Sequence, residues 1–298
     1  MKTSVMTFNV LNAWQPNSPV YRTMKARSVG AAKFVREVLP DILCLQEYDY
    51  YYRHDGEFES CISEEYSEAD TKDEIGEGAW NTIFYRKGVL EVIESGGYNF
   101  TANGFEVVPI KDDGTPLPER ASNCNRYLYP EESAEGRKGF MRTRFRSLAF
   151  ALFQNSDGKR FIVATTHFSL RKACQGAEVE FVCGLLSELE KKYLCPVILC
   201  GDFNSATTWG ATWRLLDAGL LDTYDMAEKK DDISTCHPSS GKGVDSETDR
   251  MPTGEYKTHA IDHLLANTEM KVSEFKIFAR EELLSVSDHC PTAIEFEI

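Results

Sequence analysis

Apolar residues along the chain recur in short runs that have the length of β-strands. Three of these runs are Ser4–Val10, Asp41–Glu47 and Pro196–Asp202, and the second is almost continuously apolar. Continuous apolar runs are typical of strands that are covered on both faces. The closing residues, Thr292–Ile298, instead alternate apolar and charged side chains, which predicts a strand with one buried face.

Two segments place their apolar residues at helical spacing instead. Met24, Ala31 and Val35 share one helical face, and Pro40 ends that segment. A second helix is predicted over Glu178–Tyr193. Strands outnumber helices, and no internal repeat or linker divides the chain. The pattern therefore predicts two packed β-sheets with helices outside, formed by residues 1–298 as a single domain.

Two long polar stretches interrupt these patterns. Residues 48–79 are acidic and aromatic, and we expect them to form a surface excursion. Residues 101–144 are polar and rich in Gly and Pro, which predicts a long irregular insert. Within these stretches, we expect Glu57–Glu77 and Thr101–Gly139 to flank a substrate cleft, to set substrate choice and to be removable with little loss of stability.

The composition narrows the class of substrate. The chain has 298 residues, of which 42% are hydrophobic, so it is long enough to bury a sizeable core. Its formal net charge is -14. A protein that grips duplex DNA through the phosphates normally carries a basic surface, so duplex DNA is an unfavourable partner. The acidic balance fits a small or soluble anionic substrate that is drawn in by a metal ion.

The cysteines and the N-terminal segment indicate the cellular compartment of the protein. There are nine cysteines, an odd number, none in a CxxC motif and several inside apolar runs. Buried, reduced thiols in a cytoplasmic protein explain this better than a disulfide framework or a zinc site. Asn9 and Asn12 interrupt the N-terminal segment before a signal peptide could form, and no run is long enough to span a membrane. We expect a soluble, cytoplasmic monomer.

Unusual polar residues fall where the predicted strands end. They are Asn9, Glu47, His167, Asp202, Asn204, Asp262, Asp288 and His289. An isolated charge in a partly buried position is costly, so the four carboxylates need cations or hydrogen-bond donors. The asparagines and histidines are suitable donors, and a hard ion such as Mg²⁺ is the other natural partner.

Each of these residues also has a structural explanation of its own. Glu47 could cap a strand, and a lone His167 is more often a satisfied core histidine. Asp202 could form an Asx-turn as the chain leaves a strand. Asp262 could pair with a lysine, and Asp288 could stabilise a turn. These separate explanations do not predict that all of the residues occur together, each at a strand end.

The ordered motifs "TFNVLN", "LQE", "TTHF", "GDFNS", "IDHLL" and "SDHCP" resemble those of the endonuclease/exonuclease/phosphatase (DNase I-like) superfamily. The resemblance runs from Asn9 to Pro291. The superfamily includes apurinic endonucleases, inositol polyphosphate 5-phosphatases, neutral sphingomyelinases and deadenylases. It implies a four-layer sandwich, with two mixed β-sheets face to face and helices on the outer faces. It also implies hydrolysis of phosphate esters that depends on Mg²⁺ or, as an alternative, on Mn²⁺.

The resemblance implies a metal site and a phosphate site. Glu47 corresponds to the principal Mg²⁺ ligand, with Asn9 and Asp288 near the same ion or its waters. At the phosphate site, Asp202 corresponds to the residue that orients or deprotonates the attacking water, and Asn204 to one that contacts the phosphate. His289 corresponds to the histidine that steadies the phosphoryl oxygens, and Asp262 orients it. His167 corresponds to a second histidine on the phosphate side.

Two further substrate contacts follow from the resemblance. Arg146 matches a phosphate-contacting arginine, although Arg142 and Arg144 compete for that assignment. Asn81 in "WNTIFY" lies where members of the superfamily line the substrate cleft.

The branch of the superfamily is less defined. "GDFNS" and "THAIDHLL" lack the patterns typical of inositol polyphosphate phosphatases, and Leu11 stands where apurinic endonucleases usually carry an acid. We therefore favour a small or single-stranded phosphorylated substrate. The alternative is a nuclease acting on RNA or single-stranded ends, for which Tyr50–Tyr52 and Arg137–Arg146 would supply stacking and charge. A catalytically inactive phospho-ligand binder is least favoured, because no motif residue is missing.

Overall fold

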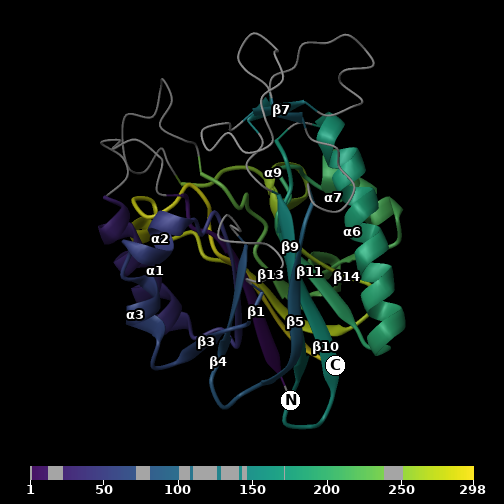
Figure 1. Ribbon diagram of the computed structural model, residues 1–298, viewed down its shortest axis with the longest axis horizontal. Coiled ribbons are helices and arrows are strands. Elements are labelled where there is room, and N and C mark those ends of the chain that lie inside the picture. The colour runs from purple at the N-terminus through teal and green to yellow at the C-terminus, as the bar shows by residue number, and fades with distance from the viewer. Residues whose placement is uncertain are drawn as a thin grey trace.

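The computed structural model describes residues 2–12, 23–71, 81–100, 108–109, 126–128, 141–142, 146–170, 172–237 and 251–298. Two mixed β-sheets lie face to face between two layers of helices (Figure 1). This arrangement confirms the predicted four-layer α/β sandwich.

The first sheet has seven strands in the order β13-β15-β16-β1-β2-β4-β3. Their bounds are β1 Thr3–Asn9, β2 Ile42–Gln46, β3 Tyr66–Glu68, β4 Thr82–Arg86, β13 Lys229–Lys230, β15 Lys271–Ile277 and β16 Thr292–Glu297. β1 and β2 run parallel, whereas β16 runs antiparallel to β1.

The second sheet has six strands in the order β12-β14-β11-β10-β9-β5. Their bounds are β5 Glu91–Asn99, β9 Ser147–Gln154, β10 Arg160–His167, β11 Val197–Asp202, β12 Leu221–Asp222 and β14 Asp262–Ala266. β10 and β11 run parallel, and β14 runs antiparallel to β11. A small third sheet joins β6 Val108–Pro109, β7 Arg126–Leu128 and β8 Met141–Arg142.

Helices form the two outer layers (Figure 1), except that the short helices Thr223–Met226 and Tyr256–His259 pack in the core between the two sheets. Their bounds are α1 Met24–Val38, α2 Tyr50–His54, α3 Phe58–Ile62, α6 Lys172–Tyr193, α7 Gly210–Asp217, α8 Thr223–Met226, α9 Tyr256–His259 and the 3-10 turn η2 Glu281–Leu283. The layer of α1–α3 packs on the seven-stranded sheet, and the layer of α6 and α7 packs on the six-stranded sheet.

The alternation of side chains along β1 explains how one strand serves two cores. Val5 joins the core between the sheets, while Met6 and Phe8 join the core beneath α1. All three side chains are buried. Full burial of such a side chain contributes about 1.5–3 kcal/mol. The apolar run in β2 divides in the same way, as expected for strands covered on both faces.

Strand direction gathers the predicted polar residues at one end of the sandwich. The parallel pairs place Asn9 beside Gln46 and His167 beside Asp202. The antiparallel strand β14 begins at Asp262, directly opposite Asp202. Because carboxyl ends of parallel strands share an edge, the motifs converge there.

Gly201, one residue before Asp202, has a steric reason to be glycine. Its φ is 140°, and a Cβ at this position would overlap the carbonyl oxygen of Thr166 on the neighbouring strand. Only glycine allows this close approach of the two backbones.

The expectation of a surface excursion over residues 48–79 is wrong for its described part. This segment forms α2, α3 and β3. Tyr48, Tyr52 and Phe58 are fully buried beneath α1 and pack their rings edge to face or tilted against one another. Large aromatic side chains dominate core energetics, so deleting residues 57–77 would remove part of a core. Most of the expected insert at 101–144 lies outside the described residues.

Among the described residues, no helix is long and apolar enough to cross a membrane. Seven of the cysteines have described side chains, and all seven are free thiols. Cys44 and Cys200 are buried, as predicted from the apolar runs that contain them, and Cys290 is buried as well. The two large sheets share one core. That residues 1–298 form a single domain stays a prediction.

Candidate active site at the strand ends

The two sheets are joined at the site by a hydrogen bond between Asn9 and Asp202. Asn9 Nδ2 donates to Asp202 Oδ2 at 3.0 Å, and both side chains are buried. Beneath them, Gln46 Nε2 donates to Thr165 Oγ1 at 2.9 Å, which links the sheets again. Polar groups inside the core therefore hold the two strand ends in register.

Asp262 and His289 form a buried pair. His289 Nδ1 lies 2.8 Å from Asp262 Oδ2, and Thr235 Oγ1 donates to the same oxygen at 2.7 Å. Because the carboxylate can only accept, Nδ1 carries the proton. His289 Nε2 then faces Asp202 Oδ2 at 3.6 Å. The ring is thus held between two carboxylates.

These contacts decide the charge of the pair. Burial lowers the pKa of His289, but Asp262 and Asp202 together bring it well above its usual value. Burial raises the pKa of Asp262 to about 6, against the opposing effect of His289. At neutral pH we therefore assign an imidazolium beside an ionised Asp262, with Asp202 as the second counter-ion.

Asp202 is the common acceptor of the site. Burial raises its pKa, but His167 and His289 together bring it below its usual range. His167 Nε2 lies 3.1 Å from Asp202 Oδ2, and Asn204 N donates to Asp202 Oδ1 at 2.9 Å. This carboxylate is held ionised by donors on several sides.

His167 and Asn204 lie side by side. Asn204 Nδ2 is 3.0 Å from His167 Nε2 and donates to Phe168 O at 2.8 Å. One ring nitrogen cannot donate to Asp202 and accept from Asn204 at once. We assign the proton to Nε2, because a hydrogen bond to a carboxylate is the stronger of the two. Burial, and then the charge of Arg146, lower the pKa of His167, so the ring is neutral.

Glu47 and Asp288 form a second acidic group beside the first. Asn12 donates to Glu47 Oε2 through both its backbone N–H, at 2.9 Å, and its side-chain amide. Asp288 Oδ1 is buried and accepts no hydrogen bond within the described part of the chain. Burial raises the pKa of Asp288, the charge of His289 opposes this rise, and the negative charge of Glu47 adds to it. Two mutually repelling carboxylates, one with an unsatisfied buried oxygen, fit a divalent cation.

A different set of three groups is also close enough to hold a metal. Ligand atoms of Asp202, Asp262 and His289 lie within 4.8 Å of one another. However, His289 Nδ1 donates to Asp262, and the pKa of the ring is raised, so neither ring nitrogen offers a free lone pair. Metal-binding histidine must be neutral. We therefore favour the Glu47–Asp288 group as the cation site.

The expected substrate contacts lie close to this cluster but are buried. Asn81 Nδ2 donates to Ser147 O at 2.8 Å, and Thr166 Oγ1 donates to the same oxygen at 2.9 Å. Arg146 is 9% exposed. Burial raises the pKa of Glu178, and the nearby charge of Arg146 opposes this rise. The side chains of Arg142 and Arg144 lie outside the described residues.

One expected nucleic-acid contact is wrong. Tyr52 is fully buried and packs against Tyr48 and Phe58, so it cannot stack on a base. The side chains of Tyr50, Tyr51 and residues 137–145 lie outside the described part of the structure.

Three positioning residues escaped the sequence interpretation. Thr235 lies in a polar loop without periodicity, yet its hydroxyl binds Asp262. Gln175 donates to Ser169 O at 2.8 Å and contacts the carbonyl of Asn204 at 3.3 Å. His263 lies inside the recognised "IDHLL" motif, and its Nε2 donates to Ser205 O at 2.9 Å. Only His263 carried a sequence signal that could have identified it.

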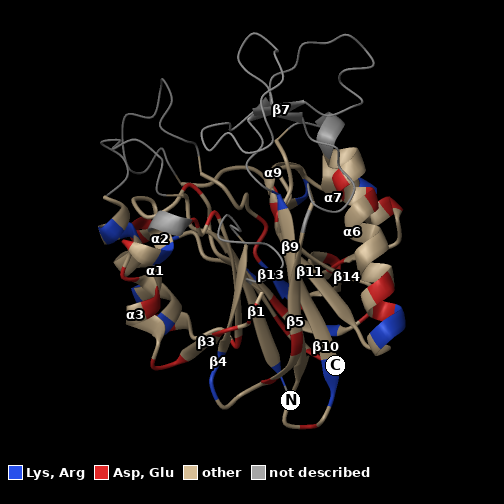
Figure 2. Ribbon diagram, in the orientation of Figure 1, with Lys and Arg blue, Asp and Glu red and all other residues tan. Residues whose placement is uncertain are grey.

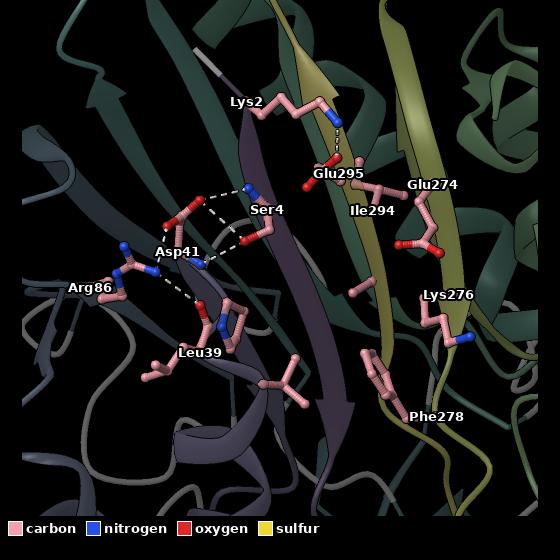
Figure 3. A pocket seen from close by; sticks show the side chains of 13 residues that line it. Lys2, Ser4, Leu39, Asp41, Arg86, Glu274, Lys276, Phe278, Ile294 and Glu295 are labelled. Carbon is pink, nitrogen blue, oxygen red and sulfur yellow. Dashed lines mark hydrogen bonds and ion pairs between the residues drawn. The ribbon is translucent and has the colours of Figure 1, made fainter. Parts of the chain in front are cut away.

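A groove of about 540 Å³ lies at the opposite end of the strands (Figure 3). Its charged side chains mainly pair with one another. Asp41 accepts from Ser4 N at 2.9 Å and lies 3.3 Å from Arg86, and Lys2 pairs with Glu295. This groove contains none of the motif residues.

Solved structures resemble the model over nearly the whole chain. An endonuclease/exonuclease/phosphatase family protein from Bacteroides thetaiotaomicron aligns with a TM-score of 0.69 at 18% identity, covering 99% of this chain and 97% of that chain. A mannosyl-6-phosphatase from the same organism gives 0.69 at 19%, covering 99% and 100%. The human Nocturnin catalytic domain, with a bound sulfate anion, gives 0.62 at 15%, covering 99% and 94%. No family model and no curated protein matches the sequence.

These similarities establish the fold. The chain has the fold of endonuclease/exonuclease/phosphatase family proteins, and the resemblance seen in the ordered motifs is confirmed at that level.

Proposed function

We propose that this protein is a metal-dependent phosphoesterase that hydrolyses a phosphodiester or phosphomonoester bond by attack of water. The observation that carries the proposal is the junction at Asp202 Oδ2, which meets Asn9 Nδ2 at 3.0 Å and His167 Nε2 at 3.1 Å. The Glu47 and Asp288 carboxylates lie beside it. Similar structures include a mannosyl-6-phosphatase and a domain that holds a sulfate anion, which supports phosphate ester chemistry.

In this proposal Asp202 orients the attacking water. Its lowered pKa keeps the carboxylate ionised, so it can accept a hydrogen bond from the water at neutral pH. The same lowered pKa makes it a weak base. The proton is therefore transferred only as the new phosphorus–oxygen bond forms, when the water becomes strongly acidic.

His289 acts on the phosphoryl group. Its Nδ1 is committed to Asp262, which leaves Nε2–H to donate to a phosphoryl oxygen. Charged donors that are already in place stabilise the developing charge without further reorganisation. Asn204 lines the same wall and offers a further donor to the phosphate through its side-chain amide. The neutral His167 has its one N–H committed to Asp202 and orients that carboxylate.

Glu47 and Asp288 would hold Mg²⁺ or Mn²⁺, with Asn9 near the ion or its waters. When bound, a divalent ion neutralises charge on the phosphoryl oxygens and stabilises the leaving oxygen. Asn12 fixes the orientation of Glu47 for this purpose through its two hydrogen bonds to one carboxylate oxygen.

A small or single-stranded phosphorylated compound is the proposed substrate class. The net charge of -14 disfavours an extended polyanion. Over the described residues, both signs of charge are interspersed on the outer helix layers, as Figure 2 shows. Buried Tyr52 and nearly buried Arg146 offer little surface to a nucleic-acid strand.

The test is hydrolysis of bis-p-nitrophenyl phosphate and p-nitrophenyl phosphate by the purified full-length protein. We expect activity with Mg²⁺ or Mn²⁺, its loss in EDTA, and a fall in kcat of about 10²–10⁴-fold in Asp202→Ala. The diester-to-monoester ratio distinguishes nuclease-like from phosphatase-like specificity.

Asp41→Ala is the matched control for this test, because Asp41 is also a buried aspartate but lies at the opposite strand end (Figure 3). It should lose stability and keep activity. Hydrolysis that is insensitive to EDTA, or equal in Asp202→Ala and wild type, would contradict the proposal.

A further inference from the structure

Arg27 is a buried cation that the proposed mechanism does not use. It lies in the first turns of α1 and is 2% exposed. Burying a guanidinium is costly unless its donors are satisfied. The partners of this side chain therefore reveal what it is there to hold.

All of the hydrogen bonds of Arg27 go to backbone carbonyls of two segments. Nη1 contacts Leu11 O at 2.5 Å and Val286 O at 3.4 Å, and Nη2 donates to Asn12 O at 3.0 Å. Nη1 also lies 3.3 Å from Val10 O. One guanidinium thus joins the residues that follow Asn9 to the residue that precedes the "SDH" motif.

These two segments carry the proposed cation site. Asn12 orients Glu47 through two hydrogen bonds. Ser287, next to Val286, donates to Asn9 O at 2.6 Å and accepts from His289 N at 3.1 Å. The position of the Asp288 carboxylate therefore depends on the same turn that Arg27 holds.

The segment after Asn9 also needs an external anchor. Leu11 has a φ of 58°, and Glu47 also has a φ of 58°. Non-glycine residues in this left-handed region are strained, and they persist only when their surroundings hold them. Arg27 donates hydrogen bonds to the carbonyl oxygens on both sides of the Leu11 turn and so fixes its unusual path.

We infer that Arg27 is the positioning residue of the cation site, holding Asn12 and the turn before Asp288 in the arrangement that brings Glu47 and Asp288 together. The inference rests on the proposed function for the identity of the ligand, but not for the positioning itself. The planar, forked guanidinium of Arg27 is essential, because a lysine ammonium of equal charge cannot reach carbonyls of both segments at once. Geometry, and not charge alone, is the contribution of Arg27.

The first test measures positioning without any metal. Hydrogen–deuterium exchange is compared in wild type, Arg27→Lys, Arg27→Gln and Val35→Ala. Val35 is the matched control, since it is a buried residue of the same helix that packs in the core beneath it. We expect both Arg27 variants to speed exchange by more than about tenfold in peptides covering residues 10–12 and 286–289. Val35→Ala should leave these peptides unchanged relative to the rest of the chain.

The second test measures Mg²⁺ and Mn²⁺ binding by titration calorimetry in the same four proteins. We expect both Arg27 variants to bind at least about tenfold more weakly, as for other residues that orient metal ligands, and Val35→Ala to bind like wild type. If charge alone mattered, Arg27→Lys would bind like wild type and Arg27→Gln more tightly, and that result would overturn the inference.

The two tests separate the inference from the proposed function. Unchanged exchange in both Arg27 variants would overturn the inference whatever the metal does. If wild type binds neither ion but the exchange result holds, the positioning role stands and the metal-dependent function fails.

Discussion

Asn9, Glu47 and Asp288 reach the site from the seven-stranded sheet, whereas His167, Asp202 and Asn204 reach it from the six-stranded sheet. In the first group Asn9 donates to Asp202 and Glu47 accepts from Asn12, but Asp288 Oδ1 accepts no hydrogen bond among the described residues. In the second group Asp202 and Asn204 make hydrogen bonds at 2.8–3.1 Å, and His167 Nδ1 has no partner within the described part of the chain. The first half thus leaves a buried carboxylate oxygen without a donor from the described residues, at the place where the proposed cation would bind, whereas in the second half the Asp202 carboxylate is already held by protein donors.

The two halves are also supported differently. The loops of the seven-stranded sheet depend on Arg27, whose charge is unusual in so buried a position. The loops of the six-stranded sheet depend on neutral groups, namely Gln175 and His263. Neutral supports tolerate loss of one partner better than a buried charge does. We therefore expect substitutions in the first half to be the more damaging.

The largest effect that this comparison predicts is a loss of Mg²⁺ affinity in the Glu47→Gln variant. Loss of one carboxylate charge should weaken Mg²⁺ binding by more than about 100-fold, since even an outer-shell partner accounts for 10–100-fold. Asp202→Ala should bind Mg²⁺ like wild type while losing turnover. Calorimetric titration of both variants measures this contrast, and Glu295→Gln, at the opposite strand end, serves as the control. Equal loss of affinity in both variants would show that the halves are not separable.

A smaller effect is expected in Tyr256→Phe. Tyr256 is fully buried, and its hydroxyl lies 2.8 Å from His263 Nδ1, which must accept because Nε2 donates to Ser205. Removing the hydroxyl leaves that nitrogen unsatisfied, which should lower the free energy of unfolding by about 1–3 kcal/mol. Urea unfolding should report this loss. We expect turnover to fall only a few-fold, because Ser205 acts on Asn204 through the backbone. A fall as large as in Asp202→Ala would contradict the indirect role.

The smallest effect concerns Glu178 on α6, a buried acid of the six-stranded half. It accepts from Ser169 N at 2.9 Å, but burial raises its pKa above 4.5. A carboxyl with a raised folded-state pKa binds protons more tightly when folded, so stability falls as pH rises through that pKa. Melting temperatures of Glu178→Gln and wild type, compared at about pH 5 and about pH 8, should shift in favour of the variant at the higher pH. A constant difference would mean that Glu178 does not titrate in this range.

Sequence patterns predicted the layers and the strand ends because both depend on local periodicity. β1, β2 and β11 end at or beside the residues expected, and the motif order implied which of them meet. The burial of Tyr48, Tyr52 and Phe58 could not be predicted in the same way, because acidic neighbours hide their apolar spacing. Thr235 and Arg27 were also missed, since their roles depend on contacts with segments that are distant in sequence.

In the "GD" pair, Gly201 is required by the fold, whereas Asp202 is required by the proposed chemistry. The glycine is required by its φ of 140° and by the Thr166 carbonyl, and neither depends on turnover. A descendant that lost Asp202 and became a binding protein would still need this glycine to keep β10 and β11 paired. In genome surveys, the glycine alone would therefore mark the architecture, and only the residues after it would distinguish an enzyme from an inactive copy.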